Sequence, residues 1–376
     1  MIENAKDLET IKETLHSTDW NFASSKPGLL DSIHPYPAKF IVDIPRTLIH
    51  TLKVPSGTYV FDPFCGSGTT LSVAQQMGHS SVGVDLNPIA CLISRVRTTE
   101  IPDRIDDLCD KIVDGATKGY RPISMNIPNI DHWFRPEIQY AVAAIESEIS
   151  LQKDSVIRDI LNLALSSILV RVSNQDSDTR YAAVSKNITA EKTYSLFISA
   201  YKKIVKALHA RNWTLYPAKI FQANTLELSA DDLPPIGLVV TSPPYPNAYE
   251  YWLYHKYRMW WLGYDPIKVK ENEIGARAHF FSGASKREKE KFPSQMAQVF
   301  SLLKKVIVPG GYICFVIGRS KIHGEYVDNA KIIENISVAN GFDFITRIDR
   351  EILPTRKSFN LSHAQIKQES ILIMRG

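Results

Sequence analysis

Short apolar runs with the length and period of β-strands occur near both ends of the chain. Residues 58–62 and 80–85 predict two strands, and a glycine-rich turn followed by a helical stretch separates them. This order of strand, turn, helix and strand is typical of a βαβ unit, in which the strands are parallel. Further strands are predicted later in the chain, at 219–223, 237–242, 310–318, 343–353 and 369–374.

The composition of these later strands indicates how they are arranged. The runs GLVV, within 237–242, and YICFVI, within 310–318, are apolar throughout. Such runs are expected for strands of a parallel sheet, which are buried on both faces. The last two strands lie close together in the sequence, which suggests a terminal antiparallel hairpin. We therefore predict an α/β fold with a doubly wound, mostly parallel sheet.

The middle of the chain has a different pattern. Apolar residues recur there at helical spacing in three long segments, 136–151, 155–172 and 191–212. With 376 residues and 44% hydrophobic content, the chain can form a full α/β core and an accessory region. We predict a large helical insertion at 100–212, which divides one α/β domain into the parts 1–99 and 213–376.

The turn DPFCGSGTT, at 62–70, directly follows the first strand. Gly66 and Gly68 lack a Cβ atom, so the backbone can turn sharply and approach a ligand closely. The third glycine of a dinucleotide turn and the lysine of a P-loop are both absent. Asp85 ends the second strand, where a carboxylate can accept hydrogen bonds from the ribose hydroxyls of an adenosyl ligand. The alternative for Asp85 is a helix N-cap, because Asn-Pro follows it.

A second unusual loop, TSPPY at 241–245, ends the strand at 237–242. Two consecutive prolines stiffen this loop, and neither has an N–H to donate. The Ser242 hydroxyl and a backbone carbonyl are acceptors suited to an exocyclic amine, and the Tyr245 ring can stack on a flat base. The alternative is a rigid turn between a strand and a helix, without a ligand.

Together these segments resemble the DNA amino-methyltransferases, the family that methylates cytosine-N4 or adenine-N6. DPFCGSGTT resembles motif I of that family, VGVDLNP at 82–88 resembles motif II, and TSPPY resembles motif IV. The segment HPYPAKF at 34–40 is similar to motif X. IFQANTLEL, at 220–228, occupies the place of motif III, with Asn224 where Asp is common.

The resemblance implies a Rossmann-like methyltransferase fold with S-adenosylmethionine as cofactor and without a metal. It implies methyl transfer to the exocyclic amine of a base flipped out of the helix, which needs no cysteine nucleophile. The catalytic residues implied are Ser242, Pro243, Pro244 and Tyr245. The cofactor-binding residues implied are His34, Pro35, Lys39, Phe40, Asp62, Pro63, Phe64, Cys65, Gly66, Ser67, Gly68, Thr69, Thr70, Asp85, Leu86, Asn87, Asn224 and Thr225.

Motifs X and I precede motif IV, with the insertion between them. Many relatives carry motif IV first, so this order resembles a circularly permuted arrangement with target recognition in the insertion. The candidate DNA contacts, there and beyond it, are Trp133, Arg135, Arg171, Asn174, Arg180, Lys256, Arg258, Arg356 and Lys357. The alternative is that the aromatic residues are core and that the charges are solvated. We expect Trp252 and Trp260, in the aromatic stretch 247–264, to belong to the core.

The net charge of +4 permits a nucleic-acid partner without requiring one. The four cysteines are scattered, which argues against a zinc site or a disulfide framework. No apolar stretch is long enough for a signal peptide or a membrane span, so we expect a soluble cytoplasmic protein. The expected partners are double-stranded DNA and a cognate restriction endonuclease or defence-system proteins. The sequence does not decide between a monomer and a dimer.

Within the resembling family, Ser in motif IV is commoner in cytosine enzymes, whereas Asp or Asn is commoner in adenine enzymes. Ser242 therefore favours cytosine-N4 as the target, with adenine-N6 as the alternative. Two further alternatives are an RNA base methyltransferase and an inactive DNA-recognition subunit. An NAD dehydrogenase is disfavoured, because the third glycine of the turn is missing.

Overall fold

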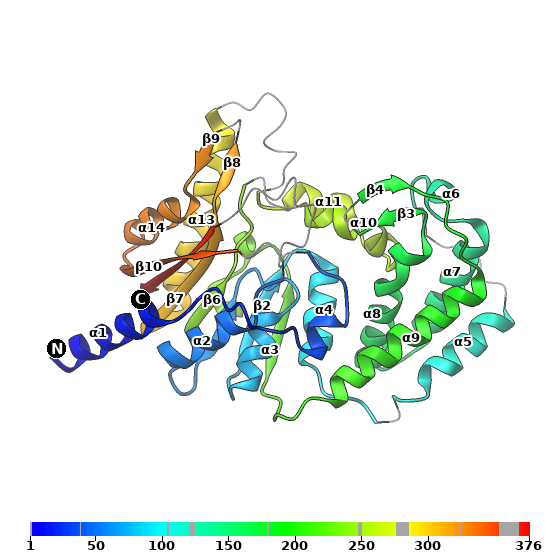
Figure 1. Ribbon diagram of the computed structural model, residues 1–376, viewed down its shortest axis with the longest axis horizontal. Coiled ribbons are helices and arrows are strands. Elements are labelled where there is room, and N and C mark those ends of the chain that lie inside the picture. Colours follow the sequence, from blue (N-terminus) through cyan, green and yellow to red (C-terminus); the bar gives the residue numbers. More distant parts are fainter. Residues whose placement is uncertain are drawn as a thin grey trace.

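A seven-stranded sheet forms the centre of the computed structural model, in the strand order β10-β11-β7-β6-β1-β2-β5 (Figure 1). The structure describes residues 2–37, 39–103, 105–119, 125–178, 180–246, 250–275, 286–322, 325–352 and 368–376. The strands of the sheet are β1 (Tyr59–Asp62), β2 (Ser81–Asp85), β5 (Ala218–Gln222), β6 (Ile236–Thr241), β7 (Ile307–Gly318), β10 (Asp343–Glu351) and β11 (Gln368–Arg375).

The pairing of the strands confirms the predicted topology. β7, β6, β1, β2 and β5 are paired in parallel. β11 is antiparallel to both β7 and β10, so the last two strands form the predicted hairpin. Each of the seven predicted strands is present in the sheet, with bounds that differ by a few residues from those expected.

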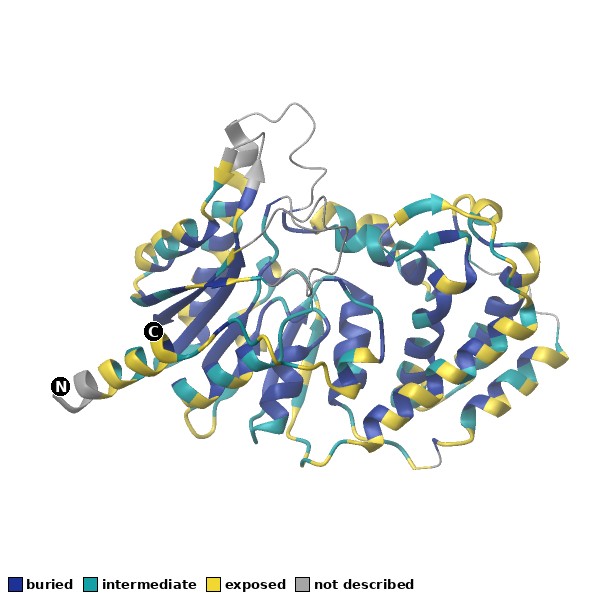
Figure 2. Cartoon of the chain, in the orientation of Figure 1, coloured by how far each residue is buried: buried dark blue, intermediate teal, exposed yellow. Residues whose placement is uncertain are grey.

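Helices cover both faces of the sheet, because successive strand residues point to opposite sides. Val60 packs with one face layer, which includes α1 (Ile2–Ser17), α2 (Asp43–Leu52) and α3 (Thr69–Gln76). Phe61 packs with the other layer, which includes α13 (Lys286–Val306) and α14 (Asn329–Ala339). A small hairpin of β8 (Ser320–Ile322) and β9 (Glu325–Val327) follows β7. In Figure 2 the buried residues accordingly concentrate in the sheet and on the inward sides of the helices.

The region predicted as a helical insertion is mainly helical. Its helices are α5 (Leu108–Lys118), α6 (Ile130–Trp133), α7 (Pro136–Ser150), α8 (Ser155–Val172) and α9 (Ala190–His209). In Figure 1 these helices lie at one end of the sheet, beside α4 (Pro88–Thr98). The region also contains a small antiparallel hairpin of β3 (Gln175–Ser177) and β4 (Arg180–Ala183).

One continuous apolar cluster joins the insertion to the rest of the chain. It includes Leu92 of α4, Phe134 and Ile138 from the insertion, and Trp261 of α10 (Tyr251–Trp261). α10 packs against α4, α8 and α11 (Pro266–Asn272). The region 100–212 is therefore packed against the α/β part through a shared core. Among the residues described, no helix is both long and apolar enough to cross a membrane.

Arg258 of α10 is part of this junction, with 1% of its surface exposed. Its Nε donates a hydrogen bond to the Ser166 carbonyl at 3.1 Å, and its Nη1 donates to the Tyr254 carbonyl at 3.0 Å. The guanidinium also forms an ion pair with Asp178 beside the β3–β4 hairpin. The proposed DNA contact at Arg258 is therefore wrong, because this side chain is enclosed and its charge is already paired.

We predict that Arg258→Ala lowers the free energy of unfolding by about 3 kcal/mol, because it leaves a partly buried carboxylate unpaired and removes the hydrogen bond that joins α10 to the Ser166 carbonyl. Arg171→Ala is the matched control, since Arg171 is an exposed arginine at the end of α8. Urea unfolding of both variants measures the difference. An equally small effect of the two substitutions would contradict the structural role of Arg258.

Candidate active site

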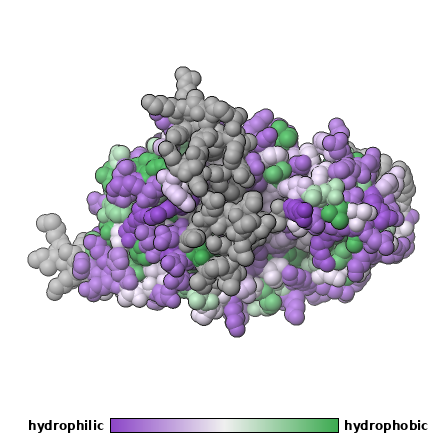
Figure 3. Space-filling view, turned by 45° about the horizontal axis from the view of Figure 1, so that its top comes forward, coloured by the Kyte–Doolittle hydropathy of each residue, from purple (hydrophilic) through white to green (hydrophobic). Residues whose placement is uncertain are grey.

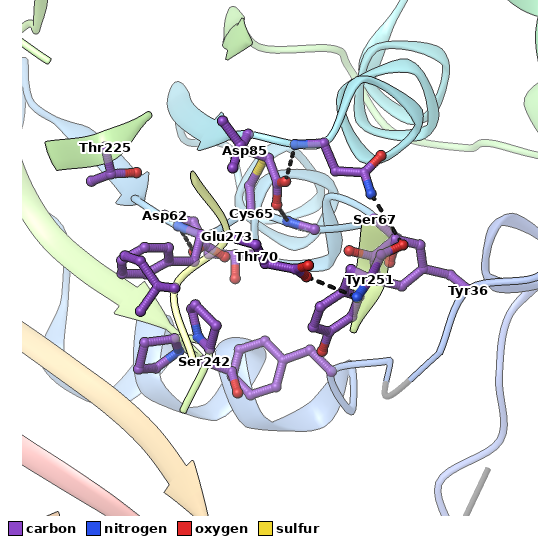
Figure 4. A pocket seen from close by; sticks show the side chains of 18 of the residues that line it. Tyr36, Asp62, Cys65, Ser67, Thr70, Asp85, Thr225, Ser242, Tyr251 and Glu273 are labelled. Atoms are coloured by element: carbon purple, nitrogen blue, oxygen red, sulfur yellow. Dashed lines mark hydrogen bonds between the residues drawn. The ribbon is translucent and has the colours of Figure 1, made fainter. Parts of the chain in front are cut away.

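The carboxyl ends of β1, β2 and β6 meet at one edge of the sheet, because these strands are parallel neighbours. A cavity lies at this edge (Figure 4). The predicted site residues that line it are Lys39, Phe40, Asp62, Phe64, Cys65, Gly66, Ser67, Thr69, Thr70, Asp85, Leu86, Asn87, Asn224, Thr225, Ser242, Pro243, Pro244 and Tyr245. The segments identified as motifs I, II, III and IV, and part of motif X, therefore meet at one place.

The turn after β1 depends on its glycines. Gly66 has φ 50° and Gly68 has φ 75°, in the left-handed region that side chains disfavour. A Cβ atom at Gly68 would lie 2.6 Å from Ser94 Oγ and 2.9 Å from Ser94 Cα, so α3 and α4 approach closely here. At Gly66 a Cβ atom would lie 3.1 Å from the Tyr36 hydroxyl, which borders the cavity. The backbone of Gly66 is thus exposed to the cavity without a side chain that covers it.

Asp85 fastens this turn to the end of β2. One carboxylate oxygen accepts a hydrogen bond from Gly66 N at 2.9 Å, and the other accepts from Asn87 N at 2.8 Å. The N-cap of α4 is Asn87, whose side chain accepts from Ile89 N, so Asp85 is not the cap. Burial raises the pKa of Asp85 to about 6, against the lowering effect of these N–H donors. Asp85 is therefore mainly ionised at neutral pH.

Hydroxyl groups attach the neighbouring loops to each other. Thr241 Oγ1 donates to the buried carboxylate of Asp62 at 2.6 Å, which joins the ends of β6 and β1. Thr225 Oγ1 donates to the Pro63 carbonyl at 2.6 Å, which fixes the segment after β5. Burial raises the pKa of Asp62 to about 6 as well. These bonds place the loop that begins at Ser242 beside the glycine-rich turn.

Comparison with known proteins agrees with this arrangement. Residues 3–95 match the model of a family described as DNA methylase. The chain is 38% identical over 87 residues to the type II methyltransferase M.MjaII of Methanocaldococcus jannaschii, which covers 21% of this chain and 16% of that protein. It is 31% identical over 154 residues to M.MvaI of Kocuria varians, covering 38% and 34%. It is 25% identical over 313 residues to M.BsoBI of Geobacillus stearothermophilus, covering 71% and 59%.

Residues 3–95 thus match the DNA methylase family, and the partial similarity to the three type II methyltransferases supports the DNA amino-methyltransferase family. S-adenosylmethionine is the methyl donor of this family. In each of the three comparisons the match spans less than two thirds of the relative's own length. The family model covers the part of the chain that holds motifs X, I and II, and the longer matches to M.MvaI and M.BsoBI have lower identity.

Four residues implied by the family resemblance do not line the cavity: His34, Pro35, Pro63 and Gly68. His34 is 2% exposed, and burial together with the nearby Arg258 charge lowers its pKa well below the usual value. The neutral ring is hydrogen-bonded to the Pro35 carbonyl at 2.6 Å and to the Ser166 hydroxyl at 2.9 Å. His34 thus joins the motif X segment, of which it is the first residue, to α8. The predicted direct contact of His34 with the cofactor is therefore wrong.

The other lining residues were not predicted as site residues, although Tyr36 lies in the motif X segment and Ala223 in the motif III segment. They are Tyr36, Ala223, Tyr251, Val269, Asn272, Glu273, Ile274 and Glu369. The Tyr36 ring stacks on the Tyr251 ring, with centroids 5.8 Å apart and planes inclined by 26°. Tyr36 lies inside HPYPAKF, so that segment itself was the available signal. Tyr251 and Glu273 reach the cavity only because α10 and α11 fold over it.

The remaining candidate DNA contacts are distributed around the insertion and α10. Arg171 and Arg180 are exposed, and Arg180 lies 3.6 Å from the carboxylate of Asp176. The ammonium of Lys256 lies over the Tyr257 ring at 4.9 Å and over the Trp260 ring at 5.3 Å from their centroids. Trp260 packs against the core at partial burial, as does Trp252, which agrees with their expected core positions.

Three more candidates of the insertion contact other residues of the protein. Arg135 Nη1 donates to the Lys186 and Ile188 carbonyls, both at 3.3 Å. Asn174 Nδ2 donates to the His132 carbonyl at 3.1 Å. Trp133 packs against the apolar core, with its ring 5.3 Å from that of Tyr257. The last two candidates, Arg356 and Lys357, lie outside the described residues.

We predict that Gly68→Ala destabilises the protein by about 2–4 kcal/mol, because a left-handed alanine costs about 1–2 kcal/mol and the added methyl overpacks the contact with Ser94. Gly57→Ala is a matched control, since Gly57 also has a left-handed φ, of 76°, but nothing lies within 4 Å of the position that a Cβ atom would take there. Thermal unfolding of both variants compares them. Equal losses would show that the contact between α3 and α4 is not tight.

Proposed function

We propose that this chain transfers a methyl group from S-adenosylmethionine to the exocyclic amine of a base in double-stranded DNA. One observation supports this above the others. The glycine-rich turn, the acidic end of β2 and the Ser-Pro-Pro-Tyr loop at the end of β6 line the same cavity. A site for an adenosyl group and a site for a planar amine would therefore be adjacent.

The residues of the cavity fit the methyl donor. The bare backbone of Gly66 leaves room beside the Tyr36 hydroxyl, and the ionised Asp85 can accept further hydrogen bonds from ribose hydroxyls. Asn224 and Thr225, after β5, would border the adenine ring, and Lys39 and Phe40 would border the methionine part. When bound, the sulfonium group supplies an electrophilic methyl. Asn224 is itself held by accepting a hydrogen bond from Leu226 N at 3.1 Å, so its carbonyl oxygen already has a partner.

The loop after β6 would hold the base. The Ser242 hydroxyl and the Pro243 carbonyl would accept the two amine protons, which favours a tetrahedral nitrogen and localises its lone pair. Tyr245 would stack on the ring, and the base must leave the duplex to reach it. Because Thr241 is tied to Asp62, this loop is positioned before the substrate arrives, and orientation accounts for much of the catalysis.

We further propose that cytosine-N4 is the methylated atom, with Ser242 as the supporting residue. A hydroxyl can accept from the amine and also donate to a ring acceptor, and cytosine carries its basic N3 beside N4. Adenine-N6 is the second candidate, because adenine has N1 in the corresponding place. The relatives named as type II methyltransferases favour a role in restriction-modification, with a cognate endonuclease as partner.

Among the described residues, Arg171 and Arg180 are exposed DNA-contact candidates on the insertion, and the partly exposed candidates are Trp133, Arg135, Asn174 and Lys256. The side chains on the face in Figure 3 are mainly hydrophilic, with small and separate hydrophobic areas. Such a surface suits a polar, charged partner, and arginine and lysine would neutralise phosphates there. The insertion at 100–212 is accordingly proposed as the target-recognition region.

The test is to incubate the full chain with labelled S-adenosylmethionine and double-stranded DNA, digest the DNA and identify the nucleoside by mass spectrometry. We expect N4-methylcytosine. N6-methyladenine alone would overturn the cytosine assignment and leave the amino-methyltransferase activity standing. Methylation of RNA but not of DNA would overturn the proposed substrate.

We predict that Tyr245→Ala lowers kcat/KM for DNA methylation by roughly 5- to 150-fold, which corresponds to the loss of about 1–3 kcal/mol of base stacking. Tyr245→Phe is the control, because it keeps the ring and should retain most of the activity. Cofactor affinity, measured by calorimetry, should change little in both variants. Methylation by Tyr245→Ala at the parent rate would contradict the stacking role.

A further inference from the structure

Glu273 is a buried acid that faces the cavity and belongs to none of the motifs. It follows α11, is 8% exposed and lines the cavity together with Asp85 (Figure 4). One carboxylate oxygen accepts a hydrogen bond from Tyr251 N at 2.8 Å, and the other accepts from Trp252 N at 3.3 Å. The carboxyl group is thus held at the start of α10, at the wall of the cavity.

Among the described residues, few groups near Glu273 can balance the negative charge of its ionised carboxylate. The acidic neighbours are Asp85 at the end of β2 and Glu250 just before α10, and the phenols of Tyr36 and Tyr251 border the same space. Lys39 also lines the cavity, but its ammonium donates to the backbone carbonyls of His34, at 3.0 Å, and of Asp31. Among the described lining residues, acids therefore outnumber bases.

We propose that Glu273 makes the cavity prefer a positively charged sulfonium ligand over the neutral thioether that remains after methyl transfer. The inference rests on the proposed function and deepens it. Methyl transfer moves a CH₃ group to the amine nitrogen, which then loses a proton, and leaves the sulfur neutral with its lone pair restored. Donor and product share the adenine, the ribose and the amino-acid end, and they differ in the methyl group and the positive charge at the sulfur.

The protonation of Glu273 supports this role. Burial raises its pKa to about 8, and Asp85 and Glu250 add to the shift against the two N–H donors. At neutral pH the empty cavity therefore holds mainly the protonated acid. A cationic ligand favours the carboxylate, so its binding should release a proton. The affinity for the sulfonium should rise as the pH increases toward about 8 and level off above, whereas a neutral thioether should show a smaller change.

The experiment is calorimetric titration of the full chain with S-adenosylmethionine and, separately, with S-adenosylhomocysteine between pH 6.5 and 8.5. Titrations in buffers of different ionisation enthalpy give the protons released. For Glu273→Gln we expect the preference for the sulfonium to fall about tenfold, the equivalent of one pKa unit from an opposite charge nearby. Glu271→Gln, at an exposed acid of α11, should keep the parent preference.

A second variant separates this inference from the proposed function. Asp85→Asn should weaken both ligands to a similar degree, because both carry the ribose. If the parent protein binds neither ligand, the proposed function fails and the inference fails with it. If both ligands bind but Glu273→Gln weakens them equally, the cofactor assignment stands and the inference is overturned. If the Glu273→Gln variant does not fold, proton release by the parent protein provides the test. Equal proton release on binding of the two ligands would overturn the role of Glu273.

Discussion

The parallel pairing of β6, β1 and β2 is the constraint on which the rest of the structure depends. The carboxyl ends of neighbouring parallel strands lie at the same edge of a sheet. The last residues of β6, β1 and β2 therefore lie close together at that edge. Asp62 and Thr241 are 179 positions apart in the chain, yet they share a hydrogen bond of 2.6 Å. The insertion can therefore occupy a large share of the sequence between these motifs without separating them in space.

A consequence of this convergence is a concentration of buried acids. Asp62, Asp85 and Glu273 all line the cavity, and burial raises the pKa of each one. Backbone N–H groups and a threonine hydroxyl compensate Asp62 and Asp85 in part, so these two are ionised near neutral pH. Glu273, with an acid beside it, titrates higher. A cavity of this kind is stabilised by a cation, which is the charge that a sulfonium ligand brings.

The parts of the structure that could be predicted from sequence are those written in local patterns. Buried strands are apolar runs, and the turn at Gly66 needs glycine for its left-handed backbone, so both were predictable. Contacts made by tertiary packing were not. Arg258 resembled a DNA contact within an aromatic, basic helix, but the docking of α8 buries it. Glu273 stood in an ordinary polar segment, and only the fold of α10 and α11 over the cavity brings it there.

Helix α10 connects the two places where prediction was weakest. Its first residue, Tyr251, lines the cavity and donates its N–H to Glu273, and seven residues later Arg258 is bound to α8 and Asp178. With a rise of about 1.5 Å per residue, these points lie about 10 Å apart along one rigid helix. The wall of the cavity at Tyr251 and the contact with the insertion at Arg258 therefore belong to one helix. In this fold the region proposed to recognise DNA and the site proposed to bind the methyl donor share α10.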